Sequence, residues 1–448
     1  MTPPAAPIPF REALRFWLKL GFISFGGPAG QIATMHTELV ERRRWISEKR
    51  FLHALNYCML LPGPEAQQLA TYIGWLMHRS WGGIVAGALF VLPSLLILIA
   101  LSWVYMAWGQ QPLVAGLFYG LKPAVTALVA HAAHRIGSRV LSNGWLWGIA
   151  AAAFVAIFAL DLPFPLIVGA AALIGHIGGR HAPQRFVLGG SHGAGGPGPG
   201  PGPGSGPAVI GDDTPTPPHA RFSRRRLAWV LGIGGGLWAA AMLALVLTQG
   251  LPGALTQMGW FFTKAALLTF GGAYAVLPYV YQGAVEHHQW LTGAQMMDGL
   301  ALGETTPGPL IMVVAFVGFV GGWTQQLLGP DALFLAGAVA AAVVTFFTFL
   351  PSFVFVLAGG PLIESTHGQL RFTAPLTAIT AAVVGVILNL ALFFAWHVLW
   401  PQGWSGRFDA LAALIAVVAG VALFRFKLGV LPLLGGCGVL GLAATALG

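Results

Sequence analysis

The chain has 448 residues, of which 56% are hydrophobic and 8% are charged. A soluble globular domain carries about 25% charged residues, so the composition excludes a soluble fold and indicates a polytopic membrane protein. The formal net charge of +9 fits an excess of Lys and Arg on the cytoplasmic side of a membrane, and we expect no nucleic-acid partner. Both cysteines lie in apolar runs and support neither a disulfide framework nor a metal site.

Apolar runs predict an all-α fold with about 13 membrane segments. Nine runs approach the roughly 20 residues that cross a bilayer. They lie near 81–108, 113–133, 145–160, 163–178, 227–249, 332–358, 375–400, 409–424 and 428–447. Glycine or proline interrupts four further apolar segments, at 16–35, 51–77, 255–281 and 294–320. Because proline lacks the helical N–H donor and glycine is a poor helix former, we expect each of these four to be a broken helix.

A Gly/Pro-rich stretch divides the chain into two membrane domains. Residues 187–220 break the apolar pattern, and the run GGPGPGPGPGSGP at 195–207 has no side chain able to form a core. Such a composition predicts a disordered cytoplasmic linker. We therefore expect an N-terminal domain (1–186) and a C-terminal domain (221–448) that contains one extra span at 227–249.

The two domains are related by an internal repeat. An offset of 245 residues joins Lys19 to Lys264, Ser24-Phe25-Gly26-Gly27 to Thr269-Phe270-Gly271-Gly272, Trp45 to Trp290, and Pro62-Gly63-Pro64 to Pro307-Gly308-Pro309. Leu92-Pro93-Ser94 matches Leu350-Pro351-Ser352 at an offset of 258. One offset that joins several separated motifs indicates a duplicated membrane unit. We call 24–27 and 269–272 the FGG breaks, and 62–64 and 307–309 the PGP turns.

Charge predicts that the repeats have opposite orientations. The loop after the first broken segment is basic (Arg42–Arg44, Lys49 and Arg50), whereas its counterpart at 285–289 has no Lys or Arg. Opposite charge in equivalent loops indicates an inverted repeat. If the broken segments are re-entrant hairpins, 19 of the 23 basic residues fall inside. If they span fully, Arg42–Arg44 would face outward, so we favour hairpins. Both alternatives put the N-terminus in the cytoplasm and the C-terminus outside.

Six ionisable residues lie within apolar segments: Lys19, Glu65, Lys122, Lys264, Asp298 and Glu304. An intramembrane charge costs at least ~2.5 kcal/mol on insertion scales, so all six are functional candidates. The alternative is an interfacial side chain that extends to the headgroups, and it stays open above all for Lys122 and Asp298 near segment ends.

The breaks suit an anion. A helix that starts at a break presents free N–H groups and the positive end of its dipole, and such half-helices bind anions in transporters with inverted repeats. The alternative is that the glycines only permit close helix packing. The candidate substrate-binding residues are Lys19, Ser24, Gly26, Gly27, Pro62, Gly63, Pro64, Lys264, Thr269, Gly271, Gly272, Pro307, Gly308 and Pro309.

The embedded acids are placed asymmetrically. Glu65 follows the first PGP turn, where the repeat equivalent is Leu310, and Glu304 precedes the second, where the equivalent is Met59. Burial favours the protonated form of a carboxyl group, so Glu65 and Glu304 are candidates for proton coupling. Structural pairing with Lys19 or Lys264 is the alternative. No hydrolase, metalloprotease or P-loop motif occurs, and we expect neither an enzyme nor a bound metal or cofactor.

At these motifs the chain resembles the chromate ion transporter (CHR) family. Phe25-Gly26-Gly27-Pro28, Trp45 and Leu61-Pro62-Gly63-Pro64 resemble its first domain, and Phe270-Gly271-Gly272 with Thr306-Pro307-Gly308-Pro309 resemble the second domain of its long members. The resemblance covers both domains but not the linker. Gly272-Ala273, where the first domain has Gly27-Pro28, departs from the pattern, as does the long linker.

The resemblance implies secondary active efflux of chromate, a tetrahedral oxyanion, across the bacterial inner membrane, coupled to the proton motive force. The C-terminus would then be periplasmic. Sulfate is a second candidate substrate, because backbone donors discriminate poorly between nearly isosteric anions, and a homodimer is a candidate assembly. The alternatives are a passive anion channel and a transporter of sulfate or another oxyanion on the same fold.

Overall fold

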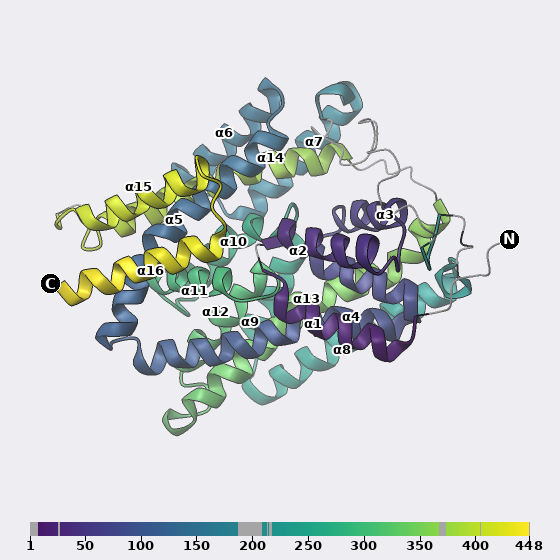
Figure 1. Ribbon diagram of the computed structural model, residues 1–448, viewed down its shortest axis with the longest axis horizontal. Coiled ribbons are helices and arrows are strands. Elements are labelled where there is room, and N and C mark those ends of the chain that lie inside the picture. The colour runs from purple at the N-terminus through teal and green to yellow at the C-terminus, as the bar shows by residue number, and fades with distance from the viewer. Residues whose placement is uncertain are drawn as a thin grey trace.

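The computed structural model describes residues 8–25, 27–186, 208–212, 214, 217–366, 373–403 and 405–447. These residues form 16 α-helices and no β-strand (Figure 1), so the expected all-α fold is confirmed. The N-terminal domain contains α1 (Phe10–Ile23), α2 (Gly27–His36), α3 (Glu48–Cys58), α4 (Glu65–Trp108), α5 (Pro112–Val140), α6 (Gly144–Phe158) and α7 (Phe164–His181), with the π-helical turn η1 (Thr37–Arg42) after α2.

The C-terminal domain repeats this order after one additional helix. Its helices are α8 (Arg224–Gln249), α9 (Ala254–Leu268), α10 (Ala273–Tyr281), α11 (Gly293–Thr305), α12 (Val313–Thr324), α13 (Leu333–Thr366), α14 (Thr373–Leu399), α15 (Ala410–Phe424) and α16 (Val430–Leu447). A second π-helical turn, η4 (Gln282–His287), follows α10 at the same repeat offset as η1. Short 3₁₀ turns lie at η2 (Pro183–Arg185), η3 (Pro218–Ala220), η5 (Leu310–Met312) and η6 (Pro330–Ala332).

Each FGG break reverses the chain. In the N-terminal domain, Arg43 at the end of the returning arm lies 3.5 Å from Glu12 at the start of α1, measured from Nη1 to Oε1. The rings of Phe16 and Trp45 are 5.2 Å apart. The repeat equivalents Phe261 and Trp290 are 5.6 Å apart. Both ends of each broken segment therefore lie at one level, which is the geometry of a hairpin.

The PGP turns form the tips of a second pair of hairpins, one between α3 and α4 and the other between α11 and α12. The chain that leaves each hairpin then turns back along itself. α4 contains non-helical backbone at His78 and Arg79, and this bend divides it into a short arm (65–77) and a long arm (80–108). The arms pack closely, since a Cβ added at Gly74 would lie 2.5 Å from the carbonyl oxygen of Gly82. α12 and α13 pack in the corresponding way, with Gly322 against Ala336.

Five helices are long and apolar enough to cross a membrane: α4, α5, α8, α13 and α14. The spans expected at 145–160, 163–178, 409–424 and 428–447 are the helices α6, α7, α15 and α16, of 15, 18, 15 and 18 residues. At 1.5 Å per residue a 15-residue helix covers about 22 Å, less than the ~30 Å hydrocarbon core. α6 and α15 are therefore short membrane helices rather than the full spans that hydropathy indicated.

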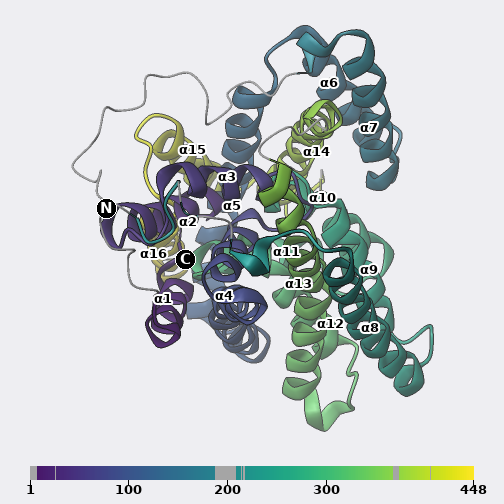
Figure 2. The same cartoon turned by 90° about the vertical axis from the view of Figure 1, so that its right-hand side faces the viewer.

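These short hairpins are exchanged between the domains. α6 and α7 pack on α14 of the C-terminal domain, and α15 and α16 pack on α5 of the N-terminal domain (Figures 1 and 2). Glycine permits the approach, since a Cβ at Gly385 would collide with the carbonyl oxygen of Ala150, and one at Gly120 with that of Cys437. The exchange ties the two domains into one body.

The domains have inverted orientations. His78 Nε2 hydrogen-bonds to the carbonyl of Ile8, just before α1, at 2.8 Å, and His219, just before α8, pairs with the carbonyl of Trp75 at 3.0 Å. α1 and α8 thus begin at one face, which Figure 2 views directly. α8 crosses the molecule, so α9 begins at the opposite face. We call the face where α1 and α8 begin the basic face. It is formed by residues 8–10, 43–50, 78–79 and 217–226.

The last part of the predicted linker is held on the basic face. Residues 187–207 lie outside the described chain, but Ile210 bridges to Ile46, and Ser47 Oγ donates to Asp212 Oδ1 at 2.6 Å. His219 binds the short arm of α4 as described above. The described residues at this end of the predicted linker, 208–212, 214 and 217–220, therefore lie against the N-terminal domain.

The exchanged hairpins lead to a prediction about stability. Gly120→Ala and Gly385→Ala should each destabilise the protein by about 1–3 kcal/mol, because the added Cβ meets backbone that cannot move aside. Gly148→Ala and Gly436→Ala are matched controls on α6 and α16, where an added Cβ meets no atom within 4 Å. The measurement is the melting temperature of the purified protein in detergent. Equal melting temperatures for all four variants would contradict the close packing of the exchanged hairpins.

Candidate functional site

The four breaks meet in crosswise pairs. The N–H of Gly63 in the first PGP turn donates to the carbonyl of Thr269 at 2.7 Å, and the N–H of Gly308 in the second donates to the carbonyl of Ser24 at 2.8 Å. Each PGP turn thus binds the FGG break of the other domain. Motifs that the sequence relates only by a repeat offset are in direct contact across the domain boundary.

These bonds occupy several of the donors that the sequence analysis assigned to an anion. The N–H groups of Gly63 and Gly308 are paired with carbonyls in this conformation. The hydroxyls of Ser24 and Thr269 donate to carbonyls four residues back in their own helices, at 2.6 and 2.7 Å. An anion could use the two N–H groups only after the crosswise bonds open.

The glycines of the breaks are required by the backbone. Gly63 and Gly308 have φ values of 123° and 105°, and Gly27, Gly271 and Gly272 are also left-handed, at 68°, 78° and 100°. Residues other than glycine rarely adopt these backbone angles. Gly26 lies outside the described residues. At both PGP glycines the space is also closed, by Ser352 beside Gly63 and by Ser94 beside Gly308.

Helices begin directly after the breaks, as expected. α2 begins at Gly27, α10 at Ala273 and the short arm of α4 at Glu65. No side chain caps the N-terminus of α10 or α4, so first-turn N–H groups remain without a side-chain partner there. The break residues themselves are closed off, since Ser24 and Thr269 are fully buried.

We call the place where the two crosswise bonds join the four breaks the crossing. The two lysines lie away from it. Lys19 and Lys264 are both exposed. Lys264 lines a cavity at the opposite face, together with Asp161, Glu286 and His288. Burial, with the nearby charges of His287 and Lys264, lowers the pKa of His288 to about 4. In the described part of the chain neither lysine forms an ion pair with Glu65 or Glu304, so the structural pairing considered above is absent.

The two embedded acids have different surroundings. Glu304 in α11 is 8% exposed and accepts a hydrogen bond from the Tyr274 hydroxyl in α10. Arg135 of α5 is close enough to interact electrostatically with both Glu304 and Tyr274. Glu65 is half-buried at the start of the short arm of α4. Glu304 is therefore tied to both domains.

Two buried amides at the crossing are not among the residues expected from the sequence, which are charged residues, two hydroxyls and the glycines and prolines of the breaks. Gln31 Nε2 donates to the carbonyl of Gly308 at 2.5 Å, and Gln68 Nε2 donates to the carbonyl of Pro62 at 2.8 Å. Both side chains are almost fully buried. Their repeat equivalents are Val276 and Val313, so only the N-terminal domain supplies these amides. The sequence feature that could have indicated these two residues is a polar amide within an otherwise apolar segment.

Lys122 and Asp298, which the sequence left open, bind each other. The Lys122 Nζ of α5 lies 3.5 Å from Asp298 Oδ2 of α11, and the hydroxyl of Tyr105 in α4 donates to the same oxygen at 2.8 Å. This cluster joins the two domains near the opposite face.

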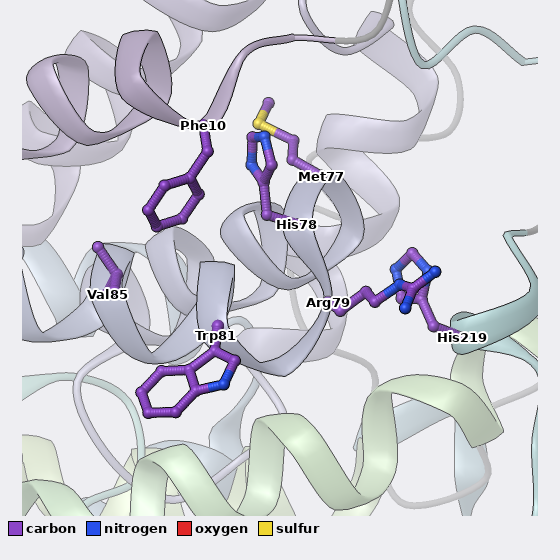
Figure 3. Close-up of a pocket in the computed structure, with 7 residues that line it drawn as sticks. All are labelled: Phe10, Met77, His78, Arg79, Trp81, Val85 and His219. Atoms are coloured by element: carbon purple, nitrogen blue, oxygen red, sulfur yellow. The ribbon is translucent and has the colours of Figure 1, made fainter.

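A second cavity, of about 800 Å³, opens on the basic face where the end of the linker is attached (Figure 3). Phe10, His78, Trp81 and His219 are among its lining residues, from α1, both arms of α4 and the linker end. Neither this cavity nor the one around Lys264 includes a break residue in its lining. The break residues therefore lie outside the walls of both cavities.

Comparisons with known proteins agree with the repeat. A family model described as chromate transporter matches residues 11–176 and 256–442. A chromate transport protein of Pseudomonas aeruginosa is 33% identical over 389 residues, covering 85% of this chain and 80% of that protein. A chromate transport protein of Cupriavidus metallidurans is 28% identical over 442 residues, covering 98% and 94%. A probable chromate transport protein of Synechococcus elongatus is 28% identical over 380 residues, covering 84% and 82%. No solved structure matches the chain.

The buried ion pair gives a prediction about stability. Lys122→Gln should cost about 3 kcal/mol, because it leaves the Asp298 carboxylate, only 4% exposed, without its counter-charge. Asp298→Asn should cost less, because Lys122 is 30% exposed and can be hydrated. The double variant should be more stable than Lys122→Gln alone. Melting temperatures of the three variants test this, and a double variant no more stable than Lys122→Gln would argue against the pair.

Proposed function

The chain belongs to the chromate transporter family, and we propose that it exports chromate by secondary active transport driven by the proton motive force. It is a multi-pass membrane transporter and not an enzyme. The observation that carries the proposal is the crosswise pairing of the breaks, Gly63 with Thr269 and Gly308 with Ser24. Two equivalent closures around one buried point are what alternating access requires.

We propose that each crosswise bond closes one side of the transport path. Rocking of the domains would open the Gly63–Thr269 pair or the Gly308–Ser24 pair, but not both at once. The opened PGP turn would then offer its N–H group to an oxygen of the anion. The helix N-termini at Gly27, Ala273 and Glu65 would stabilise the dianion through their dipoles.

The exposed lysines support a role in attracting the anion rather than in binding it at the crossing. Lys264 lines the cavity at the opposite face, and Lys19 occupies the equivalent position on α1. A positive charge at a vestibule raises the local concentration of an anion. Sulfate has nearly the same shape and charge as chromate, so it is expected to compete.

Glu304 is the stronger candidate for proton coupling. Its carboxyl group is buried between α10 and α11, accepts from Tyr274 and lies within Coulomb range of Arg135. Gain or loss of a proton would change its attraction to Arg135 in the other domain, and so would couple protonation to domain movement. Glu65, which has no hydrogen-bond or ion-pair partner in the described part of the chain, is the corresponding candidate in the N-terminal domain.

The basic face supports an orientation. It carries Arg43, Arg50 and Arg79 together with the linker end, and positive residues accumulate on the cytoplasmic side. We therefore propose that this face is cytoplasmic in the bacterial inner membrane, with the C-terminus in the periplasm and chromate leaving the cell.

Transport by purified protein in proteoliposomes tests the proposal. Chromate flux should follow an imposed pH gradient and fall to background when a protonophore removes the gradient. Glu304→Gln should reduce gradient-driven flux at least tenfold but retain chromate exchange, because exchange needs no net proton transfer. Asp331→Asn, in the exposed turn η6 between α12 and α13, is the control, because Asp331 lines neither cavity. Flux that ignores the gradient and survives Glu304→Gln together with Glu65→Gln would indicate a passive anion channel instead.

Salt dependence tests the lysines. Lys19→Ala and Lys264→Ala should each raise the KM for chromate several-fold at low ionic strength, and the effect should shrink at high salt, because screening removes electrostatic attraction. Lys427→Ala, in the loop between α15 and α16, is the control. A KM increase that persists unchanged in high salt would mean that the lysines contact the bound anion directly.

A further inference from the structure

Two serines of the long helices lie against the PGP turns of the opposite domain. Ser94 of α4 contacts Gly308, since a Cβ placed on that glycine would lie 2.7 Å from the Cβ of Ser94. Ser352 of α13 contacts Gly63 in the same way, and a Cβ there would collide with the Ser352 hydroxyl. These serines belong to the repeated Leu-Pro-Ser motif, to which the proposed function gives no role.

In the part of the chain that the structure describes, the hydroxyl hydrogens of both serines lack an acceptor. A buried serine or threonine in a helix usually donates to the carbonyl four residues back, as Ser24 and Thr348 do here. Ser94 Oγ is fully buried and has no hydrogen-bond partner among the described residues. Ser352 Oγ is 1% exposed and only accepts, from Gln68 Nε2 at 3.5 Å. Leaving a buried hydroxyl unpaired costs free energy, so a ligand that accepts these hydrogens would offset that cost.

The position of each serine matches that of a second donor. Ser94 lies beside Gly308, and Ser352 beside Gly63, the two residues whose N–H groups make the crosswise bonds. When a crosswise bond opens, a hydroxyl and an N–H group lie side by side and both lack an acceptor. Proline at the preceding position, Pro93 or Pro351, marks a turn where the helix bends readily.

We propose that Ser94 and Ser352 bind the transported anion, each donating its hydroxyl hydrogen to one oxygen of a tetrahedral oxyanion. Ser94 is joined by the Gly308 N–H when the Gly308–Ser24 bond is open, and Ser352 is joined by the Gly63 N–H when the Gly63–Thr269 bond is open. Each pair combines a turn from one domain with a helix from the other. This inference rests on the proposed function and extends it to residues that the break motifs do not contain.

Equilibrium binding and transport of chromate by the purified full-length protein test the inference. Ser94→Ala and Ser352→Ala should each raise the Kd and KM for chromate about tenfold, the size expected for a lost hydrogen bond to a charged group, with a melting temperature no lower than that of the wild type. Ser102→Ala is the matched control, because Ser102 also lies in α4, is fully buried and has no partner, but does not contact a PGP turn. It should bind chromate with the wild-type Kd.

Substitution by cysteine separates binding from packing. Ser94→Cys and Ser352→Cys fill the place of the hydroxyl with a somewhat larger sulfur atom and leave no cavity, but they donate hydrogen bonds weakly, so they should lose affinity as the alanine variants do. The inference would be overturned if the wild-type protein transports chromate and the alanine variants bind it with the wild-type Kd. It would also be overturned if only the cysteine variants bind chromate with the wild-type Kd. If the wild-type protein neither binds nor transports chromate, the proposed function fails first and the inference fails with it.

Discussion

Two backbone hydrogen bonds at the centre of the molecule decide how the rest is arranged. A polar backbone group inside a membrane must find a partner, because water is not available to it. The PGP turns interrupt their helices and leave such groups exposed, and the partners come from the FGG breaks of the other domain, Gly63 with Thr269 and Gly308 with Ser24. Neither domain can satisfy its own breaks in this way. The exchanged hairpins α6–α7 and α15–α16 hold the domains in the position that these bonds require.

The backbone is nearly symmetric at the crossing, but the side chains are not. Gln31 and Gln68 of the N-terminal domain hydrogen-bond to the PGP turns, whereas valine occupies both equivalent positions in the C-terminal domain. The acids are also placed unequally, before one PGP turn and after the other. In the proposed mechanism, the two closures would give two related states, and the unequal side chains would make those states differ in energy.

The sequence was sufficient to predict the repeat, the breaks and their hairpins, because glycine, proline and tryptophan recur at one offset. It could not predict that each break pairs with the other domain, since an offset carries no information about contacts. The apolar runs at 145–160 and 409–424 located α6 and α15 to within two residues, but each helix has only 15 residues and is shorter than a full span. Lys19 was assigned to the crossing from its position five residues before Ser24. The residue four before, Leu20, shares the face of Ser24 and is buried, so Lys19 lies about 100° further around the helix and points outward.

One pair of equivalent positions shows how the two copies of a duplicated unit come to carry different charges. The left-handed residues Arg44 and Gln289, with φ of 53° and 52°, place Arg43 and His288 against the same aromatic pair in the two domains. The Arg43 guanidinium lies 5.0 Å from the ring centres of both Phe16 and Trp45. His288 stacks on Trp290, with the ring centres 4.4 Å apart. Because burial lowers the pKa of His288 to about 4, this ring is neutral at neutral pH, while arginine stays charged. The same packing position therefore carries a positive charge at the basic face and no charge at the opposite face. The two inverted copies can thus differ in charge while they keep the same backbone fold.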